Sequence, residues 1–221
     1  MFVRRLSTGG KITAIRLQAK DSSRVNVHLD DSFAFGLAKI LAVSLKRGQD
    51  LTDEAIAELQ RRDEEERAYQ QACRWIARRP RSEAELVKYF ERKQVGSSAQ
   101  AGAMHRLHQA GLVDDRAFAQ AWVENRMAFR PRSAWALRVE LKQKGVDSAD
   151  IDAALSTFDE RGAALLAARK AARRWQQADQ PLFQKRVGEY LRRRGFHLPI
   201  IRAVVEQVWC EATEHESEVR E

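Results

Sequence analysis

Hydrophobic and polar residues alternate near the N-terminus, a pattern typical of strands with one buried face. Val25, Val27 and Leu29 alternate with polar residues, and an earlier apolar run precedes them across a polar turn. The pattern predicts a β-hairpin within residues 12–35. The phenylalanines at its end, Phe33 and Phe35, either form a third short strand or pack against the next helix.

The spacing of apolar residues then changes to three or four, which predicts a helix from about residue 36 to residue 45. Gly48 interrupts this segment. Thr52 is a good N-cap for a further helix. The charged stretch 60–66 either continues that helix with a solvated surface or links it to the next module, and we expect the continuous helix. Residues 1–62 are therefore expected to form an N-terminal module of a β-hairpin plus helices.

The rest of the chain contains an internal repeat. Residues 79–82 and 130–133 both read Arg-Pro-Arg-Ser, at an offset of 51, and the same offset aligns the apolar residues that follow. A third copy lies at an offset of 50, with Gly195 aligned to Gly145. We therefore predict three-helix repeats over residues 63–112, 113–160 and 161–210, followed by an acidic C-terminal tail over residues 211–221.

Within a repeat, the pattern predicts a helix, a proline break, a second helix, a glycine break and a third helix. Pro131 ends the first helix of the second repeat because the residue before a proline is disfavoured in helical conformation. Ser133 caps the second helix, and Gly145 suits a left-handed position after it. Asp147 or Ser148 then caps the third helix.

The first repeat has its own variations on this pattern. Ser82 and Glu85 form the S-x-x-E capping box, which predicts a helix start at Ser82. Gln94 stands where the second repeat has its glycine. We therefore expect this helix to end later, at Gly96.

Tandem repeats of this size stabilise one another by stacking. The sequence thus predicts a mainly α-helical protein, an elongated curved solenoid of three-helix repeats with the small N-terminal module attached. Its long face suits a groove or a filament better than a catalytic pocket. The chain has no P-loop, G-x-S-x-G or dinucleotide-binding motif, so we expect neither enzyme activity nor a cofactor.

Five short motifs occur in a fixed order along the repeats. They are Arg79-Pro80-Arg81-Ser82 with Glu85 and Leu86; Gly111-Leu112-Val113-Asp114-Asp115 with Phe118 and Ala119; Arg130-Pro131-Arg132-Ser133; Leu141 with Lys144-Gly145-Val146 and Ile151; and Tyr190-Leu191 with Arg194-Gly195-Phe196 and Ile201. Over residues 66–210 this series resembles the RecX family, bacterial regulators of the RecA recombinase. The N-terminal module resembles the extension found in longer members.

The resemblance implies a non-enzymatic protein that lies in the helical groove of the RecA filament on single-stranded DNA. It implies inhibition of RecA ATPase, strand-exchange and coprotease activities, by blocking filament growth or promoting disassembly. It also implies a place in homologous recombination, DNA repair and the SOS response. Residues 178–185 of the third repeat depart from the Arg-Pro-Arg-Ser motif, so a role for that loop does not carry over there.

The chain is basic, with 39 Lys and Arg against 31 Asp and Glu, a net charge of +8 and a pI near 9.8. This balance points to polyanions or acidic protein surfaces as partners. We expect the RecA- and DNA-binding residues in the two proline loops and in the basic stretch of the third repeat. The candidates are Arg79, Arg81, Arg130, Arg132, Arg169, Lys170, Arg173, Arg174, Lys185, Arg186, Arg192, Arg193 and Arg194.

Each candidate group has a plainer interpretation. Arg169, Arg173 and Arg174 are expected on one side of one helix, where they bind a partner or form a solvated surface. The loop arginines either contact a repeating partner or pair with carboxylates within their own repeat. Trp135 lies in the first turn of a helix and is expected to be exposed, whereas core packing is expected for the other tryptophans. The acidic tail is either a frayed helix end or a cover over the basic surface.

Two other functions are compatible with the repeats. One is a stand-alone DNA-binding protein with units like helix-turn-helix domains, although residues 83–85 and 134–136 carry few base-reading side chains at the helix starts. The other is an adaptor for a different acidic helical assembly. We expect a monomer, with weak direct DNA contact at most.

The sequence favours a cytoplasmic location without metal or membrane. Cys73 and Cys210 lack the spacing of zinc ligands and suit a reducing compartment. His105 and His108 have no third ligand nearby in the sequence. No window reaches the roughly 18 apolar residues of a spanning helix.

Overall fold

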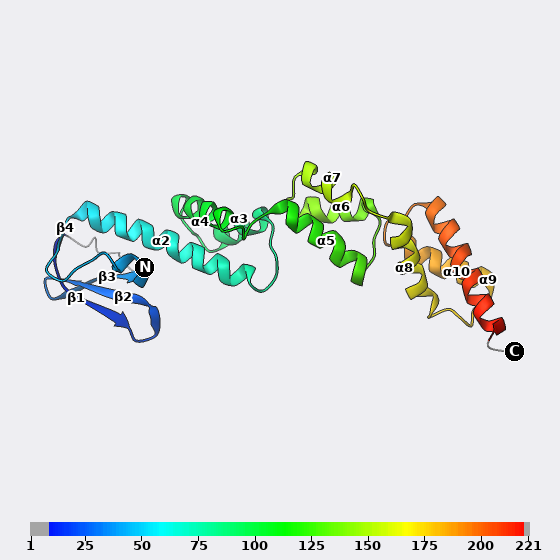
Figure 1. Cartoon of the computed structure of the whole chain (residues 1–221), viewed down its shortest axis with the longest axis horizontal. Helices are drawn as coiled ribbons and strands as arrows, with labels where there is room; N and C mark the ends of the chain where they lie inside the picture. The colour runs from blue at the N-terminus through cyan, green and yellow to red at the C-terminus, as the bar shows by residue number, and fades with distance from the viewer. Residues whose placement is uncertain (1–8, 219–221) are drawn as a thin grey trace. The chain divides into compact units, whose positions relative to one another are not determined.

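The computed structural model describes residues 9–218, which form two units (Figure 1). The first unit takes in the chain up to Arg81 together with Leu86–Val113. The second takes in Ser82–Glu85 and the chain from Asp114 onward. Within the described residues there are ten helices and four strands, which confirms the predicted mainly α-helical fold with a small N-terminal β module.

Four antiparallel strands form the sheet of the first unit. They are β1 (Gly10–Gln18), β2 (Asp21–Leu29), β3 (Ser32–Ala38) and β4 (Asp50–Leu51), in the order β3-β2-β1-β4. The predicted hairpin corresponds to β1 and β2, and the phenylalanines belong to a third strand. Asp30 and Asp31 turn the chain between β2 and β3 with φ angles of 46° and 62°, which suit the twist of a tight hairpin.

The helix predicted over residues 36–45 is wrong for most of its length. Residues 36–38 belong to β3, and α1 spans only Lys39–Ala42. Leu37 pairs with Val25 in the sheet and is fully buried, whereas Ile40 is 69% exposed. The two residues therefore do not share a buried helical face, and strand pairing prevails over the helical spacing.

A single long helix, α2 (Asp53–Ile76), connects the sheet to the first three-helix repeat. Thr52 Oγ1 accepts a hydrogen bond from the Ala55 N–H at 3.2 Å, which confirms the predicted cap. The helix continues through the charged stretch as expected, so the boundary predicted at residue 62 falls inside it. That stretch is not wholly solvated, because Asp63 and Glu66 are buried.

The remaining helices of the first repeat are α3 (Glu83–Arg92) and α4 (Ser97–Gln109). The predicted end of α3 at Gly96 is wrong. Gln94 adopts a left-handed φ of 55° at the position of the second repeat's glycine, and α3 ends two residues earlier. The same backbone bond closes this turn in all three repeats: Val95 N–H to Phe90 O, Val146 N–H to Leu141 O, and Phe196 N–H to Leu191 O.

The second unit contains α5 (Asp115–Phe129), α6 (Ala134–Gln143), α7 (Ser148–Leu155), α8 (Glu160–Ala172), α9 (Gln180–Arg192) and α10 (Leu198–Glu218). Ser133 caps α6 through its side-chain oxygen, as the sequence predicts. Asp147, one of the two candidates for α7, caps that helix, and Asp114 caps α5 in the same way. Gly145 and Gly195 follow α6 and α9 with φ angles of 81° and 87°. Local signals therefore define most helix ends in this unit.

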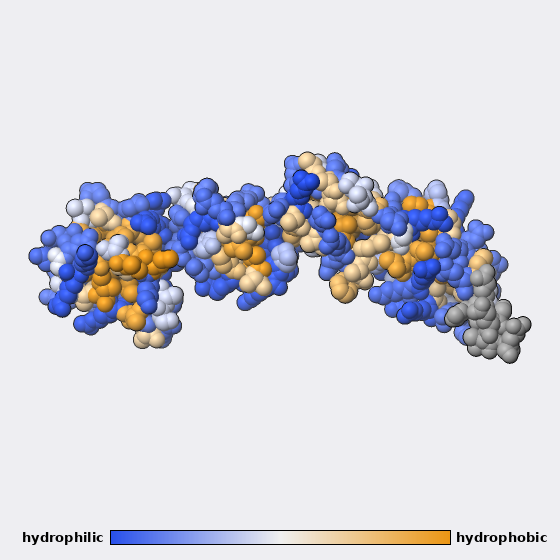
Figure 2. Space-filling view, viewed as in Figure 1, coloured by the Kyte–Doolittle hydropathy of each residue, from blue (hydrophilic) through white to orange (hydrophobic). Residues whose placement is uncertain are grey.

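Hydrophilic residues cover most of the surface in Figure 2, and the visible hydrophobic residues gather most densely over the N-terminal sheet. Over residues 9–218, no helix combines the length and the apolar character needed to cross a membrane.

Candidate partner-binding surface

The loop between α5 and α6 presents two arginines beside a fixed backbone. The α5 helix ends at Phe129, two residues before Pro131, because proline has no N–H to continue the helical hydrogen bonding. Ser133 Oγ accepts a hydrogen bond from the Ala136 N–H at 3.1 Å and starts α6. Arg130 and Arg132 therefore lie on a loop that is held at both ends.

The turn after α9 binds directly to this loop. The Ser133 N–H donates to the backbone oxygen of Arg194 at 3.1 Å. Gly195 makes the approach possible, because a Cβ at this position would lie 2.6 Å from Ser133 Oγ. The turn and the loop are more than sixty residues apart in the sequence, and one backbone hydrogen bond joins them.

We therefore expect Gly195→Ala to destabilise the second unit by about 1–3 kcal/mol, because alanine is strained at positive φ and its Cβ meets Ser133. Gly188→Ala is the matched control. Gly188 lies inside α9 and a Cβ there makes only an ordinary contact with Ile201, so alanine is expected to leave stability unchanged or raise it. Urea unfolding of both variants measures the difference. Equal midpoints for Gly195→Ala and the parent would contradict this account of the turn.

The contact brings four arginines together, which we name the arginine cluster: Arg130, Arg132, Arg193 and Arg194. Arg130, Arg132 and Arg193 are exposed and Arg194 is half-buried. Burial lowers the pKa of Arg194, and the positive charges of Arg132, Arg193 and Arg130 lower it further, against an opposing effect of Tyr190. The Arg194 guanidinium lies 3.6 Å from the centre of the Tyr190 ring. Arginine stays protonated in proteins, so the cluster concentrates positive charge.

The carboxylate of Glu140 partly offsets this charge. Glu140 of α6 forms an ion pair with Arg132, whose Nε lies 3.1 Å from its carboxylate. It also accepts hydrogen bonds from Arg126 Nε and Trp122 Nε1, each at 2.8 Å. Because Glu140 is shared with Arg126, it cannot neutralise the cluster. The remaining guanidinium donors suit carboxylate or phosphate groups, which arginine binds in bidentate fashion.

An exposed aromatic ring lies next to the cluster. Trp135, in the first turn of α6, is 60% exposed, as predicted. A Cβ at Gly195 would lie 3.4 Å from its Cε3 atom, so the ring borders the turn that carries Arg193 and Arg194. An exposed tryptophan beside arginines is a combination that binds both anionic groups and flat or apolar ones.

The first proline loop is arranged differently. The Arg81 guanidinium lies over the Trp75 ring, 3.9 Å from its centre, and Arg79 is exposed and donates to Pro80 O at 3.3 Å. Arg81 thus makes a contact within the first unit.

The expectation that Arg169, Arg173 and Arg174 share one side of one helix is wrong. The α8 helix ends at Ala172, so Arg173 is its C-cap residue and Arg174 lies in the turn that follows. Arg169 forms a two-pronged ion pair with Glu211 of α10, at 2.8 and 2.9 Å. In this respect Glu211, the first residue of the predicted acidic tail, covers part of the basic surface.

The pairing with Arg169 is expected to lower the pKa of the Glu211 carboxyl. Its hydrogen bonds from Arg169 hold its pKa below the ordinary value of 4.5. Because the folded-state pKa is lowered, the pair stabilises the fold above the ordinary carboxyl range and is lost as pH falls through the lowered pKa. Arg169→Gln should raise the pKa of Glu211 towards 4.5 in a carboxyl ¹³C NMR titration, whereas Arg173→Gln should leave it unchanged. An unchanged pKa in Arg169→Gln would show that the pair does not form in solution.

The other basic candidates lie on or near α8 and α9. Lys170 Nζ is 3.5 Å from Phe129 O, and Arg186 Nη1 is 3.9 Å from a Glu189 carboxylate oxygen. Lys185 and Arg192 are exposed. These residues add positive charge to the third repeat, although they do not converge as the arginine cluster does.

Sequence reasoning missed the roles of two residues that shape the surface. Glu140 and Tyr190 contact three arginines of the second unit. Glu140 belongs to none of the motifs, and Tyr190 belongs to one without being identified there as a partner of Arg194. Their one sequence signal is spacing, because Tyr190 lies one helical turn before Arg194, so that the two side chains share a face. Among the described residues, no group of three or more His, Cys, Asp or Glu side chains is arranged to hold a metal ion.

Three family models match the chain. The "Regulatory protein RecX N-terminal domain" matches residues 10–52, "RecX, first three-helix domain" matches residues 68–107, and "RecX, second three-helix domain" matches residues 114–155. These matches cover the sheet and the first two repeats.

Individual proteins of the same name are similar to this chain over most of its length. "Regulatory protein RecX" of Bacillus subtilis (strain 168) is 30% identical over 208 residues, covering 92% of this chain and 79% of the relative. The protein of the same name in Geobacillus sp. (strain WCH70) is 30% identical and covers 96% and 82%. A crystal structure of regulatory protein RecX superposes with a TM-score of 0.69 at 25% identity, over 89% of this chain and 98% of the other. A structure of RecX from Lactobacillus salivarius shares the fold, with a TM-score of 0.56 at 18% identity over 66% of this chain and 96% of the other.

Proposed function

The chain belongs to the RecX family of regulatory proteins, and we propose that it binds the RecA–DNA filament and inhibits the ATPase, strand-exchange and coprotease activities of RecA. It acts by binding rather than by catalysis, in the cytoplasm, as a monomer. The filament is a polyanionic partner, because its DNA carries a phosphate at every nucleotide. Inhibition follows if the bound protein blocks filament growth or promotes disassembly.

The observation that carries this proposal is the arginine cluster. Two segments distant in the sequence meet through the Ser133–Arg194 hydrogen bond, and the exposed Arg130, Arg132 and Arg193 lie close enough to Arg194 to act on its charge. Positive charges held close together repel one another and so lower the stability of the folded protein. A bound anion relieves this repulsion. The repeats at 113–160 and 161–210 supply this surface.

Single-stranded-DNA-dependent ATP hydrolysis by RecA of the same source tests the proposal. We expect the hydrolysis rate to fall as this protein is titrated in. The order of addition separates the two mechanisms. A protein that blocks filament growth lowers the hydrolysis rate only when it is added before assembly, whereas one that promotes disassembly lowers the rate in either order. An unchanged rate at a large excess over RecA, in both orders of addition, would refute the proposal.

A second function, direct binding of single-stranded DNA, is favoured by the position of Trp135. An exposed ring beside guanidinium groups offers a base-stacking platform next to phosphate contacts. Fluorescence anisotropy with a labelled oligonucleotide, without RecA, tests it. We expect the affinity to fall steeply with salt and to fall further in Trp135→Ala. If Trp135→Ala binds the oligonucleotide as the parent does, any DNA binding is electrostatic only and the stacking role is excluded.

A further inference from the structure

The first unit contains a groove that shares no residue with the arginine cluster. It has a volume of about 560 Å³ and lies among the start of β2, α1 and the second half of α2. This size falls in the range of sites that receive a few side chains of a ligand. The groove is built wholly from residues of the sheet module and the long helix, so it needs no other part of the chain.

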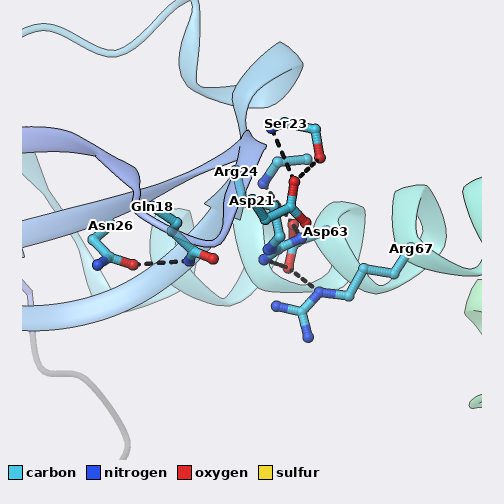
Figure 3. Close-up of polar contacts among 8 residues, drawn as sticks. Gln18, Asp21, Ser23, Arg24, Asn26, Asp63 and Arg67 are labelled. Carbon is cyan, nitrogen blue, oxygen red and sulfur yellow. Dashed lines mark hydrogen bonds and ion pairs between the residues drawn. The ribbon is translucent and has the colours of Figure 1, made fainter.

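Buried Asp63 fixes the basic wall of the groove (Figure 3). Its carboxylate accepts from both Nη atoms of Arg24, at 3.1 and 2.9 Å, and forms an ion pair with Arg67 Nε at 2.9 Å. Arg67 uses only its Nε in this pair, and its side chain is 50% exposed. Its guanidinium is therefore held in place while keeping donors for a ligand.

Two further cations line the groove. Among the described residues, neither Lys39 nor Arg74 has a carboxylate within ion-pair distance. The two acidic residues of the lining are already engaged. Asp21 accepts from the Ser23 hydroxyl and N–H, at 2.5 and 2.9 Å, and Glu66 binds Arg106 at 2.8 Å. The groove therefore offers positive charge that is not balanced by its own carboxylates.

The same groove exposes aliphatic side chains. Ile40 and Val43, on α1 and at its end, are 69% and 80% exposed. They border the cations rather than packing into the core, and both are β-branched, so little side-chain entropy is lost when they are covered. None of the lining residues is aromatic, so the groove has no stacking surface for a nucleic-acid base.

We propose that this groove is a docking site for an acidic peptide segment of a partner protein, one that places aliphatic side chains on Ile40 and Val43 and carboxylates on Lys39, Arg67 and Arg74. The positive charge of the groove calls for a negatively charged peptide. The two exposed aliphatic residues call for apolar side chains in that peptide. The inference goes beyond the proposed function. It gives the N-terminal module a protein-binding role that holds whichever partner the arginine cluster binds.

Fluorescence anisotropy with the full chain tests the proposal. The probe is a fluorescein-labelled synthetic peptide in which leucines recur every three or four residues among glutamates. One comparison peptide replaces its leucines by serine and another replaces its glutamates by glutamine. We expect the parent peptide to bind at physiological salt and both comparison peptides to bind about tenfold more weakly or worse.

Variants of the chain locate the binding. Ile40→Ser with Val43→Ser, and separately Lys39→Glu with Arg74→Glu, should each weaken the peptide about tenfold. The matched controls are Leu166→Ser with Leu182→Ser, exposed leucines of the second unit, and Arg116→Glu with Lys142→Glu, which should leave affinity unchanged. All substituted side chains are exposed, and circular dichroism checks that each variant stays folded.

Three results would overturn the proposal. Equal binding of the serine-substituted peptide would reduce the interaction to charge alone. Unchanged affinity in both groove variants would place the peptide elsewhere. Displacement of the peptide by an oligonucleotide in a chain whose arginine cluster is substituted would make the groove a nucleic-acid site.

Discussion

Replacing Asp63 by alanine is expected to destabilise the first unit by about 3 kcal/mol. The Asp63 side chain is 6% exposed, and its carboxylate holds three partners: Arg24 on β2, the Ala38 N–H at the end of β3, and Arg67 one turn along α2. Without it, Arg24, whose side chain is only 14% exposed, and the Ala38 N–H lose their acceptor inside the protein. Removing one member of a buried ion pair costs about 3–5 kcal/mol, and the exposure of Arg67 places this case at the lower end.

Hydrogen exchange measured by mass spectrometry is suited to this test because it reports on each segment separately. In Asp63→Ala we expect faster exchange in β2, β3 and α2, with little change in the helices of the second unit. Glu58→Ala is the matched control on the same helix. Glu58 forms an exposed, two-pronged pair with Arg61, and surface pairs of this kind contribute little. If the two variants exchange alike, Asp63 does not tie the sheet to α2.

Asp63 also shows why sequence reasoning located helices better than it located the core. The charged stretch from residue 60 to residue 66 correctly indicated a continuous helix, because helical spacing and capping are local properties. The same stretch predicted a solvated surface, yet Asp63 and Glu66 are buried. Their burial depends on Arg24 and Arg106, partners about forty residues away, and no local pattern encodes such pairs.

Turns show the same division between local and distant information. Gly145 was correctly placed at a left-handed position because glycine is the usual residue there. Gln94 adopts the same conformation without that signal, and the helix end was therefore misplaced. The error at α1 has a comparable cause. Leu37, Ile40 and Leu41 fit a helix by spacing, and only pairing with β2 reveals that Leu37 belongs to a strand.

The candidate binding surface follows this rule as well. The basic residues can be named as candidates from the sequence, because charge is read directly from it. Their grouping in space was not predicted. Arg169 was expected beside Arg173 and Arg174 and instead pairs with Glu211, whereas Arg130 and Arg193 were treated separately and belong to one cluster. The Ser133–Arg194 contact between repeats decides which charges add together.

The charge-reversed variant Arg130→Glu with Arg193→Glu is therefore expected to lose at least about tenfold in apparent affinity for RecA filaments, measured by the concentration that halves RecA ATP hydrolysis. These two members of the cluster are exposed, so their replacement leaves intact the Arg132–Glu140 pair and the packing of Arg194 on Tyr190. Arg116→Glu with Lys142→Glu changes net charge by the same amount. Those residues lie at the ends of α5 and α6 that are remote from the connecting loop, and the variant should inhibit nearly as well as the parent.

The dependence on salt then identifies the groups that the cluster meets. If the arginines contact DNA phosphates, the slope of log affinity for a bare oligonucleotide against log salt should fall by about one for each arginine removed. If they contact carboxylates of RecA, that slope should stay unchanged while inhibition of RecA is lost. Loss of inhibition by both variants alike would assign the effect to net charge and remove the cluster from the interface. The arginines are brought together by the Ser133–Arg194 backbone contact, which Gly195 makes possible. Gly195→Ala should therefore lose part of the inhibition of RecA although its net charge is unchanged. An explanation by net charge alone predicts no such loss.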